Sequence, residues 1–190
     1  MKAMHIDDVL DRAHVVSLPL AVRFRGITTR EALLIDGPAG WGEFAPFLEY
    51  GPAESAAWLR AGLEAAYEGF PEPVRDSIEV NATIPAVPAS EVPALVERYP
   101  GCRTFKIKVA EKGHTLADDA ARVRAVRDTI TQRGDIPILR VDANGGWSVD
   151  EAVEAAQMMM PLDYMEQPCA TTEELAQVRG RLMRAGLFVR

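Results

Sequence analysis

The second half of the chain alternates short apolar segments with longer amphipathic ones, and this rhythm constrains the fold more than any other feature. The apolar segments have the length and β-branched content of strands, and the amphipathic segments repeat apolar residues at helical spacing. Strands that alternate with helices predict parallel strands joined by crossover helices. We expect strands at 78–84, 104–109, 136–141, 162–165 and 187–189, and helices at 89–99, 116–131, 149–160 and 172–185.

Four strand–helix units and the start of a fifth are fewer than a closed (β/α)₈ barrel requires. Such a barrel typically takes about 250 residues by itself, whereas this chain has 190 in total. We therefore predict an α/β domain at residues 77–190 that is the first, incomplete half of a (β/α) barrel, in a chain truncated at its C-terminal end. The alternative is an open, doubly wound sheet.

Residues 1–76 follow a different pattern, which predicts an α+β domain ahead of the barrel. The turn Asp36-Gly37-Pro38 separates two of its strand-like segments. Apolar residues at three- and four-residue spacing predict one helix at 52–67. The expected strands are 15–20, 22–24, 31–35 and 40–44.

The composition excludes several classes of protein. Hydrophobic residues make up 48% and charged residues 26%, which is typical of a globular chain and not of a disordered one. The net charge of −7 gives no general attraction for nucleic acid or for anionic membranes. Two cysteines, Cys102 and Cys169, predict free thiols in a reducing compartment. With no secretory leader pattern and no apolar run of about 20 residues, we expect a cytoplasmic protein.

Ionisable side chains stand at the C-terminal ends of three predicted strands. Lys106 and Lys108 are two residues apart and therefore point to the same face of their strand. Asp142 ends the next strand, and Glu166 ends the one after it. Each feature alone also fits a role without chemistry: the lysines could be solvated, Asp142 could form a turn in an Asp-x-Asn sequence, and Glu166 could be an acid in the loop before a helix. Together they lie at the edge where barrel enzymes assemble their active sites, and they predict a catalytic site.

These residue types fit the abstraction of a proton next to a carboxylate. The reaction places two negative charges on neighbouring oxygens, which a cation held by carboxylates stabilises. A lysine serves as the base when burial and neighbouring cations lower the pKa of its ammonium group. We assign the base to Lys108, beside Lys106, and the metal to Asp142 and Glu166. Ligands with oxygen only favour Mg²⁺, or Mn²⁺, over zinc.

Four short segments resemble the enolase superfamily in its muconate-lactonizing-enzyme-like branch. They are Gly40-Trp41-Gly42-Glu43, Lys106-Ile107-Lys108, Asp142-Ala143-Asn144 and Glu166-Gln167-Pro168. Within this branch, segments 22–28, 42–50 and 105–110 are similar to the o-succinylbenzoate synthase family of actinobacterial type. The similarity extends over nearly the whole chain.

The resemblance implies an N-terminal capping domain, a barrel, and a magnesium-dependent lyase of menaquinone biosynthesis. Such a lyase dehydrates 2-succinyl-6-hydroxy-2,4-cyclohexadiene-1-carboxylate to o-succinylbenzoate. By this resemblance Lys108 removes the α-proton and then protonates the leaving hydroxyl, while Lys106 assists electrostatically. Asp142 and Glu166 are then the first two Mg²⁺ ligands, and Asn144 lies near the substrate or the metal's ligand shell. Capping-domain residues that screen the substrate would be Arg23, Arg25 and 47–50, although both arginines equally fit solvated strand charges.

The family also places a third acidic ligand on the next strand, of which the sequence contains only the beginning. We therefore expect weakened metal binding, low activity of the chain by itself, and self-association through the open side of the half-barrel. Two alternatives remain open. One is another activity of the same branch, namely N-acylamino acid racemase, dipeptide epimerase or cycloisomerase. The other is an inactive truncated fragment.

Other polar residues are expected to have ordinary surface roles. Arg122, Arg124 and Arg127 alternate with apolar residues on a predicted helix, which favours a solvated outer face over an RNA-binding patch. No metal-ligand spacing relates the histidines, so we expect surface or loop positions for His5, His14 and His114.

Overall fold

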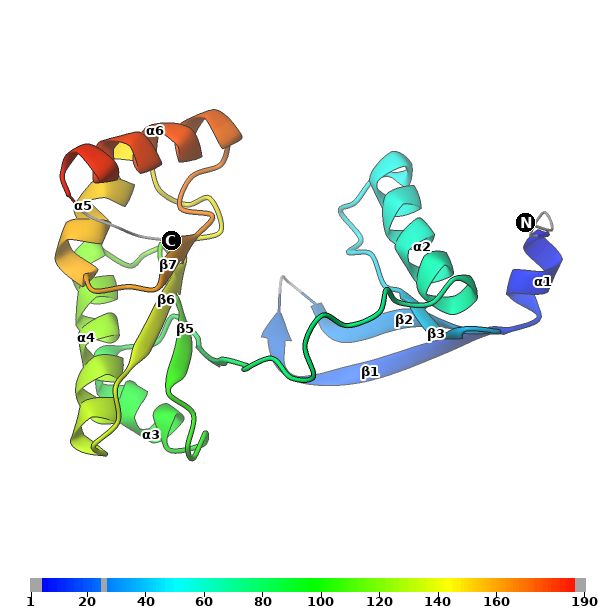
Figure 1. Cartoon of the computed structure of the whole chain (residues 1–190), viewed down its shortest axis with the longest axis horizontal. Helices are drawn as coiled ribbons and strands as arrows, with labels where there is room; N and C mark the ends of the chain where they lie inside the picture. The colour runs from blue at the N-terminus through cyan, green and yellow to red at the C-terminus, as the bar shows by residue number, and fades with distance from the viewer. Residues whose placement is uncertain (1–4, 25–26, 187–190) are drawn as a thin grey trace. The chain divides into compact units, whose positions relative to one another are not determined.

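The computed structural model describes residues 5–24 and 27–186 and divides the chain into two compact units (Figure 1). The first unit comprises residues Met1–Asp76 and the second Ser77–Arg190. The first holds an antiparallel sheet with helices and the second a parallel sheet with helices, as predicted for a capping domain and a partial barrel. No helix in the described ranges has both the length and the apolar character needed to cross a bilayer.

The first unit is a three-stranded antiparallel sheet with the order β1-β2-β3, and helix α2 packs on one face of it (Figure 1). Close packing of helix on sheet depends on glycine, because a Cβ atom on Gly42 would overlap the carbonyl group of Gly62 in α2. Ile35 and Ala66 are fully buried where sheet and helix meet. The elements of this unit are α1 (Ile6–Leu10), β1 (Ala13–Phe24), β2 (Ile27–Gly37), β3 (Gly40–Phe44) and α2 (Pro52–Tyr67).

The second unit is a parallel sheet whose strand order, β4-β5-β6-β7, follows the order of the sequence. Successive neighbouring strands of this kind form the wall of a barrel and not a doubly wound sheet, in which the strand order reverses. The strands are β4 (Ala82–Ile84), β5 (Thr104–Lys108), β6 (Ile138–Asp142) and β7 (Tyr164–Glu166). The helices are the 3₁₀ turn η1 (Ala89–Glu91), α3 (Val92–Val96), α4 (Leu116–Gln132), α5 (Val149–Met159) and α6 (Thr172–Arg184).

One apolar core lies between this sheet and its helices. Fully buried side chains from the strands meet fully buried side chains from α4 and α5, among them Phe105, Ile107, Val123, Val126 and Val141. Helices α4, α5 and α6 each begin with a capping box. The side chain of a Ser or Thr accepts a hydrogen bond from the backbone amide three residues later, and the acidic side chain at that later position accepts one from the backbone amide of the Ser or Thr. These caps fix where each loop at the carboxyl edge of the sheet ends.

Several boundaries differ from the prediction. The strands expected at 15–20 and 22–24 form one strand, β1, which begins at Ala13; it contains Pro19 because β1 is an edge strand, where a missing amide hydrogen is tolerated. The strand expected at 78–84 forms only at Ala82–Ile84, and both Ile78 and Val80 are exposed. The helix expected at 89–99 is a 3₁₀ turn followed by a single short helix. Helix α1 was not predicted, and the strand expected at 187–189 lies outside the described residues.

The prediction that the three arginines of α4 lie on a solvated face is wrong for Arg122. Arg122 is fully buried, whereas Arg124 is exposed and Arg127 is partly buried. The reason is that Asp119, one helical turn earlier, is also buried and forms an ion pair with Arg122. A buried arginine is tolerated when its charge and its donors are matched in this way.

Candidate active site

Strand β5 directs its two lysines to one face of the sheet. Phe105 and Ile107 point to the opposite face, where the helices bury them completely, and Lys106 and Lys108 are only partly buried. This alternation follows from the two-residue repeat of a strand. The lysines therefore lie on the face that becomes the interior of a barrel, as the sequence pattern predicts.

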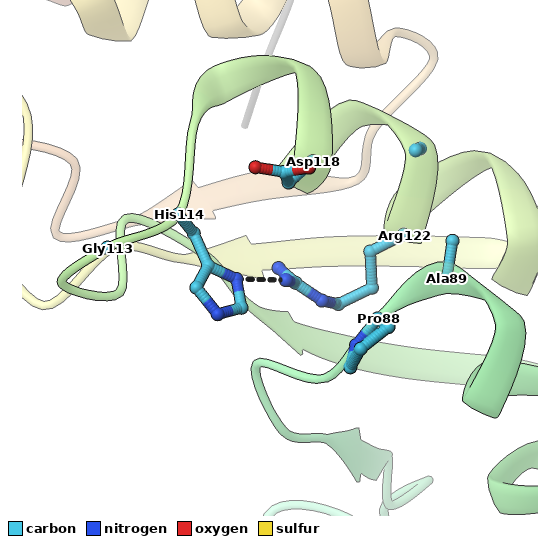
Figure 2. A pocket seen from close by; sticks show the side chains of 7 residues that line it. Pro88, Ala89, Gly113, His114, Asp118 and Arg122 are labelled. Carbon is cyan, nitrogen blue, oxygen red and sulfur yellow. Dashed lines mark hydrogen bonds between the residues drawn. The ribbon is translucent and has the colours of Figure 1, made fainter.

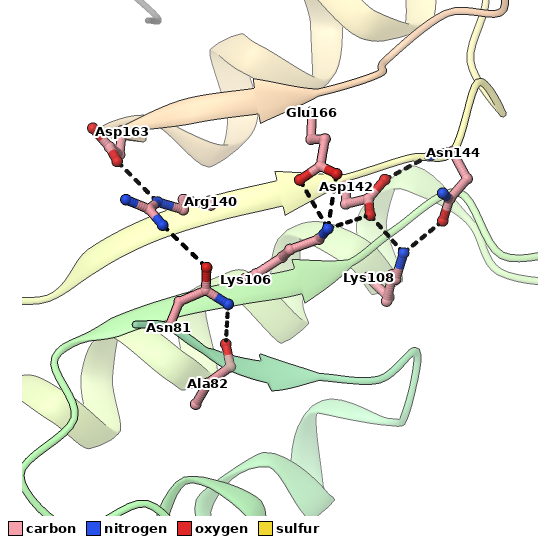
Figure 3. Close-up of polar contacts among 9 residues, drawn as sticks. All are labelled: Asn81, Ala82, Lys106, Lys108, Arg140, Asp142, Asn144, Asp163 and Glu166. Carbon is pink, nitrogen blue, oxygen red and sulfur yellow. Dashed lines mark hydrogen bonds and ion pairs between the residues drawn. The ribbon is translucent and has the colours of Figure 1, made fainter. Parts of the chain in front are cut away.

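The two acids reach the same edge because the strands are parallel and in register. Asp142, the last residue of β6, pairs with Lys108 on one side and with Glu166 of β7 on the other. Figure 3 shows the four side chains converging beyond the strand ends. Asp142 is buried, whereas the Glu166 side chain is 40% exposed. The structure therefore brings together the four side chains that the sequence singled out, Lys106, Lys108, Asp142 and Glu166, at one edge of the sheet.

The two ammonium groups share Asp142. Lys106 Nζ lies 2.9 Å from Asp142 Oδ2 and donates to Glu166 Oε1 at 2.8 Å. Lys108 Nζ donates to Asp142 Oδ2 at 2.5 Å and to Asn144 Oδ1 at 2.7 Å. Asn144 has a left-handed backbone (φ 48°), and its amide N–H donates to Asp142 Oδ1 at 3.0 Å. Asparagine adopts this conformation more readily than most residues, so it suits a position that must fold back on Asp142.

These contacts set the charges of the site. Burial acts to raise the pKa of Asp142, but the hydrogen bonds from Lys108, Lys106 and the Asn144 amide outweigh it, so the pKa is lowered. Burial likewise acts to lower the pKa of Lys106, but hydrogen bonds to Glu166 and Asp142 outweigh it, so the pKa is raised. Asp142 therefore stays ionised and Lys106 stays cationic at neutral pH, which agrees with an electrostatic role for Lys106.

The carboxylates fit a hard divalent cation. Asp142 and Glu166 both contact the single Lys106 Nζ position, at 2.9 and 2.8 Å, so the two carboxylates reach one cationic centre between them. Mg²⁺ in proteins often has only one or two carboxylate ligands, and water or substrate oxygens complete its octahedron. Within the described ranges, no cluster of three or more acidic, His or Cys side chains could hold a metal. The described residues thus offer two carboxylates that could ligate such a cation, through oxygen atoms alone.

The capping-loop candidates belong to the first unit. Arg25 and the side chain of Arg23 lie outside the described residues. In the loop after β3, the ring of Phe47 has its centre 4.2 Å from the guanidinium group of Arg30 of β2, and Tyr50 stacks on Trp58 of α2. This aromatic cluster gives the loop a defined shape.

Two polar groups near the site were not predicted from the sequence. Arg140 of β6 lies on the same face as Asp142, and it contacts Asp163 Oδ2 at 2.9 Å and Asn81 Oδ1 at 3.0 Å (Figure 3). Asp119 and Arg122 form the second group, behind the end of β5. The sequence did contain a signal for the second group. Positions 119, 122 and 126 fall on the buried stripe of α4, so charges at the first two required burial of a matched pair.

Comparisons with known proteins agree with this architecture. The family model described as enolase C-terminal domain-like matches residues 89–187, more than half of the chain, and the model described as enolase N-terminal domain-like matches residues 15–66. The chain is 59% identical to o-succinylbenzoate synthase of Mycolicibacterium smegmatis over 180 residues, covering 93% of this chain and 54% of that protein. It is also 59% identical to the enzyme of the same name from Mycobacterium marinum, covering 93% and 53%. The chain thus spans about half the length of the curated relatives it matches.

Solved structures show the same fold. The L-Ala-D/L-Glu epimerase of Bacillus subtilis superimposes with a TM-score of 0.67 at 25% identity, covering 87% of this chain and 63% of that one. An o-succinylbenzoate synthase of Thermosynechococcus elongatus, with magnesium in its active site, superimposes with a TM-score of 0.56 at 18% identity, covering 90% and 64%. Because the enolase C-terminal domain-like model matches more than half of the chain, the chain belongs to the enolase superfamily.

Proposed function

We propose that this chain contributes the capping domain and the first half of the active site of an o-succinylbenzoate synthase. The observation that carries the proposal is the convergence of Lys106, Lys108, Asp142 and Glu166 at one edge of the parallel sheet. The identity of 54–59% to curated o-succinylbenzoate synthases supports the choice of activity within the superfamily. The substrate is then a small carboxylate, 2-succinyl-6-hydroxy-2,4-cyclohexadiene-1-carboxylate, and the product is o-succinylbenzoate.

In this proposal Lys108 carries the proton in both halves of a dehydration. Its neutral amine takes the proton from the carbon next to the substrate carboxylate, and the electron pair of that C–H bond moves onto the carboxylate, from which it returns to form a ring double bond as the hydroxyl leaves. The neighbouring C–O bond then breaks, and the Lys108 ammonium returns the proton to the departing hydroxyl, which leaves as water. Proton transfers of this kind contribute about 10²- to 10⁴-fold to the rate.

The other side chains hold charge in place. Asp142 and Glu166 would hold a divalent cation, which supplies electrostatic stabilisation to the negative charge that develops on the substrate carboxylate. Lys106, which the two acids keep cationic, adds positive charge on the same side. Asn144 fixes Lys108 Nζ at 2.7 Å and so restricts the direction from which the base approaches the substrate. Mg²⁺ is the proposed cation, with Mn²⁺ as a substitute.

A second candidate activity has its own support. The L-Ala-D/L-Glu epimerase of Bacillus subtilis is among the structural neighbours, with a TM-score of 0.67. Epimerisation needs the same abstraction of a proton beside a carboxylate, so the described half of the site serves both reactions equally. They differ in the step that follows, because the dehydration expels a hydroxyl group whereas the epimerisation returns a proton to the opposite face of the same carbon.

The test is a dehydration assay with N-succinyl amino acids as the competing substrates. Because the chain spans about half of its curated relatives, the assay is run on this chain and on a chimera that continues with the remaining half of the Mycolicibacterium smegmatis enzyme. We expect the chimera to form o-succinylbenzoate in a reaction that requires Mg²⁺ and is lost in Lys108→Ala. A chimera that is folded but racemises N-succinyl amino acids without dehydrating the cyclohexadiene would contradict the proposal.

A further inference from the structure

We propose that Arg122 and Asp119 are positioning residues, which lock the backbone that carries Lys108 and thereby aim its amine. This inference rests on the proposed function in that it takes Lys108 as the base. Neither residue is bonded to the side chains of the site, and Arg122 reaches Lys108 only through its backbone carbonyl. Both belong to α4, on the side of the sheet opposite to the lysine side chains, and both are buried.

Arg122 joins three separate segments through one guanidinium group. Its Nε donates to the Val87 carbonyl at 2.5 Å, after β4, and one terminal nitrogen donates to the Lys108 carbonyl at 3.0 Å. The other terminal nitrogen lies 2.6 Å from Nδ1 of His114, in the loop before α4 (Figure 2). The rigid, planar fork of arginine suits this task, because it holds several acceptors in fixed directions at once.

Asp119 holds the next part of the same loop. One carboxylate oxygen accepts from Arg122 at 2.6 Å, and the other accepts from the Ala110 amide at 2.8 Å. Between these two anchors, the Val109 amide donates to the Asp142 carbonyl at 3.1 Å. Each of the three successive residues from Lys108 to Ala110 is therefore held by a hydrogen bond to another segment, which opposes a shift of the strand end that carries the base.

The loop after β5 packs closely against the loop after β6. Ala110 has a left-handed backbone (φ 58°), and a Cβ atom added to Gly146 would lie 2.8 Å from the Ala110 Cβ. The loop that follows Lys108 is thus in close contact with the loop that follows Asp142. Loss of the Asp119–Ala110 hydrogen bond would loosen the position of the base relative to Asp142, and a displacement of about 1 Å at a reacting group can cost about 100-fold in rate.

The experiment uses the four lysines of the chain as reporters. With ¹³C-labelled lysine, the ε-methylene region contains few signals, and Lys108→Arg assigns the one from Lys108. The test variants are Arg122→Gln, which keeps an amide donor but lacks the charged fork, and Asp119→Asn, and neither adds a lysine signal. The matched control is Arg127→Gln on the same helix, because Arg127 donates to the carbonyls of Met159 and Pro161, away from β5.

We expect both test variants to shift the Lys108 signal towards that of the exposed Lys112, and to speed hydrogen exchange of the Val109 and Ala110 amides about tenfold or more. The control is expected to change neither. In the active chimera, the same variants should lower kcat about 10- to 100-fold with little change in KM, the pattern of an impaired transition-state contact.

A Lys108 signal that is identical in wild type, test variants and control would overturn the inference. Failure of both test variants to fold, with a folded control, would also overturn it, because the pair would then serve the fold as a whole. The result is separable from the proposed function, since the lysine spectrum needs no turnover. If the Lys108 signal depends on Arg122 and Asp119 but the chimera has no dehydration activity, this inference stands and only the proposed activity is refuted.

Discussion

Replacement of Asp142 by asparagine measures how strongly the site is held together by charge. Asp142 accepts from Lys108 at 2.5 Å, lies 2.9 Å from Lys106 and accepts from the Asn144 amide at 3.0 Å. A hydrogen bond to a charged partner contributes about 1.5–3 kcal/mol, against about 0.5–1.5 for a neutral one. Loss of the charge on two such bonds therefore costs about 2–3 kcal/mol. Water reaches both lysine side chains, which are 21% and 29% exposed, so we expect about 2 kcal/mol of lost unfolding free energy.

A double-mutant cycle shows how much of the lost unfolding free energy comes from the Asp142–Lys108 ion pair. We expect Asp142→Asn and Lys108→Met to be coupled by about 1 kcal/mol or more, since each removes the same ion pair. The matched control replaces exposed Lys112 by methionine, for which we expect additivity with Asp142→Asn. A coupling to Lys108 below about 0.5 kcal/mol, the ordinary scatter of additive pairs, would refute the reasoning.

Urea unfolding must report on the second unit alone. Of the three tryptophans, Trp147 lies in that unit and is 7% exposed, whereas Trp41 and Trp58 lie in the first unit and are exposed. The cycle is therefore measured by fluorescence in a background in which Trp41 and Trp58 are replaced by phenylalanine.

Three further predictions concern stability. Folding lowers the pKa of Asp142, so the contribution of its carboxylate to the stability of the folded state is complete above the unfolded-state pKa of 3.8 and disappears as pH falls through the lower, folded-state pKa. The difference in Tm between wild type and Asp142→Asn should therefore be constant from about pH 5 to 8 and shrink below about pH 4. Gly146→Ala should destabilise by about 1–3 kcal/mol, because its Cβ would crowd Ala110, whereas Gly180→Ala, inside α6 with ordinary contacts, should stabilise by about 0.5–1 kcal/mol in the same urea assay. Ser148→Ala removes the cap of α5 and should cost about 1 kcal/mol by thermal unfolding.

The site was predictable because its residues stand where apolar strands end. Each of the four residues, Lys106, Lys108, Asp142 and Glu166, interrupts or ends a short strand-like segment, and parallel strands bring such ends to one edge. The strand rhythm and the two-residue repeat were enough to place all four. The sequence did not determine their contacts, since the sharing of Asp142 by two lysines depends on the register of β5, β6 and β7.

What the sequence did not reveal depends on long-range packing. Arg122 was expected to be a solvated helix charge, and its burial follows from the ion pair with Asp119 together with the carbonyls of Val87 and Lys108, which lie outside α4. Ile78 and Val80 have strand-like residue types, yet β4 pairs with β5 only from Ala82 to Ile84. The burial of Arg122 and the start of β4 both depend on contacts with other segments of the chain.

Paramagnetic relaxation by Mn²⁺ tests the central claim, that the amine of Lys108 and the carboxylates of Asp142 and Glu166 form one cation-binding catalytic edge. Mn²⁺ is titrated into the ¹³C-lysine-labelled chain while its four lysine signals are followed. The signals of Lys106 and Lys108 should broaden before that of Lys112, excess Mg²⁺ should reverse the broadening, and Glu166→Gln should abolish it. Equal broadening of all lysine signals, unchanged in Glu166→Gln, would contradict the account.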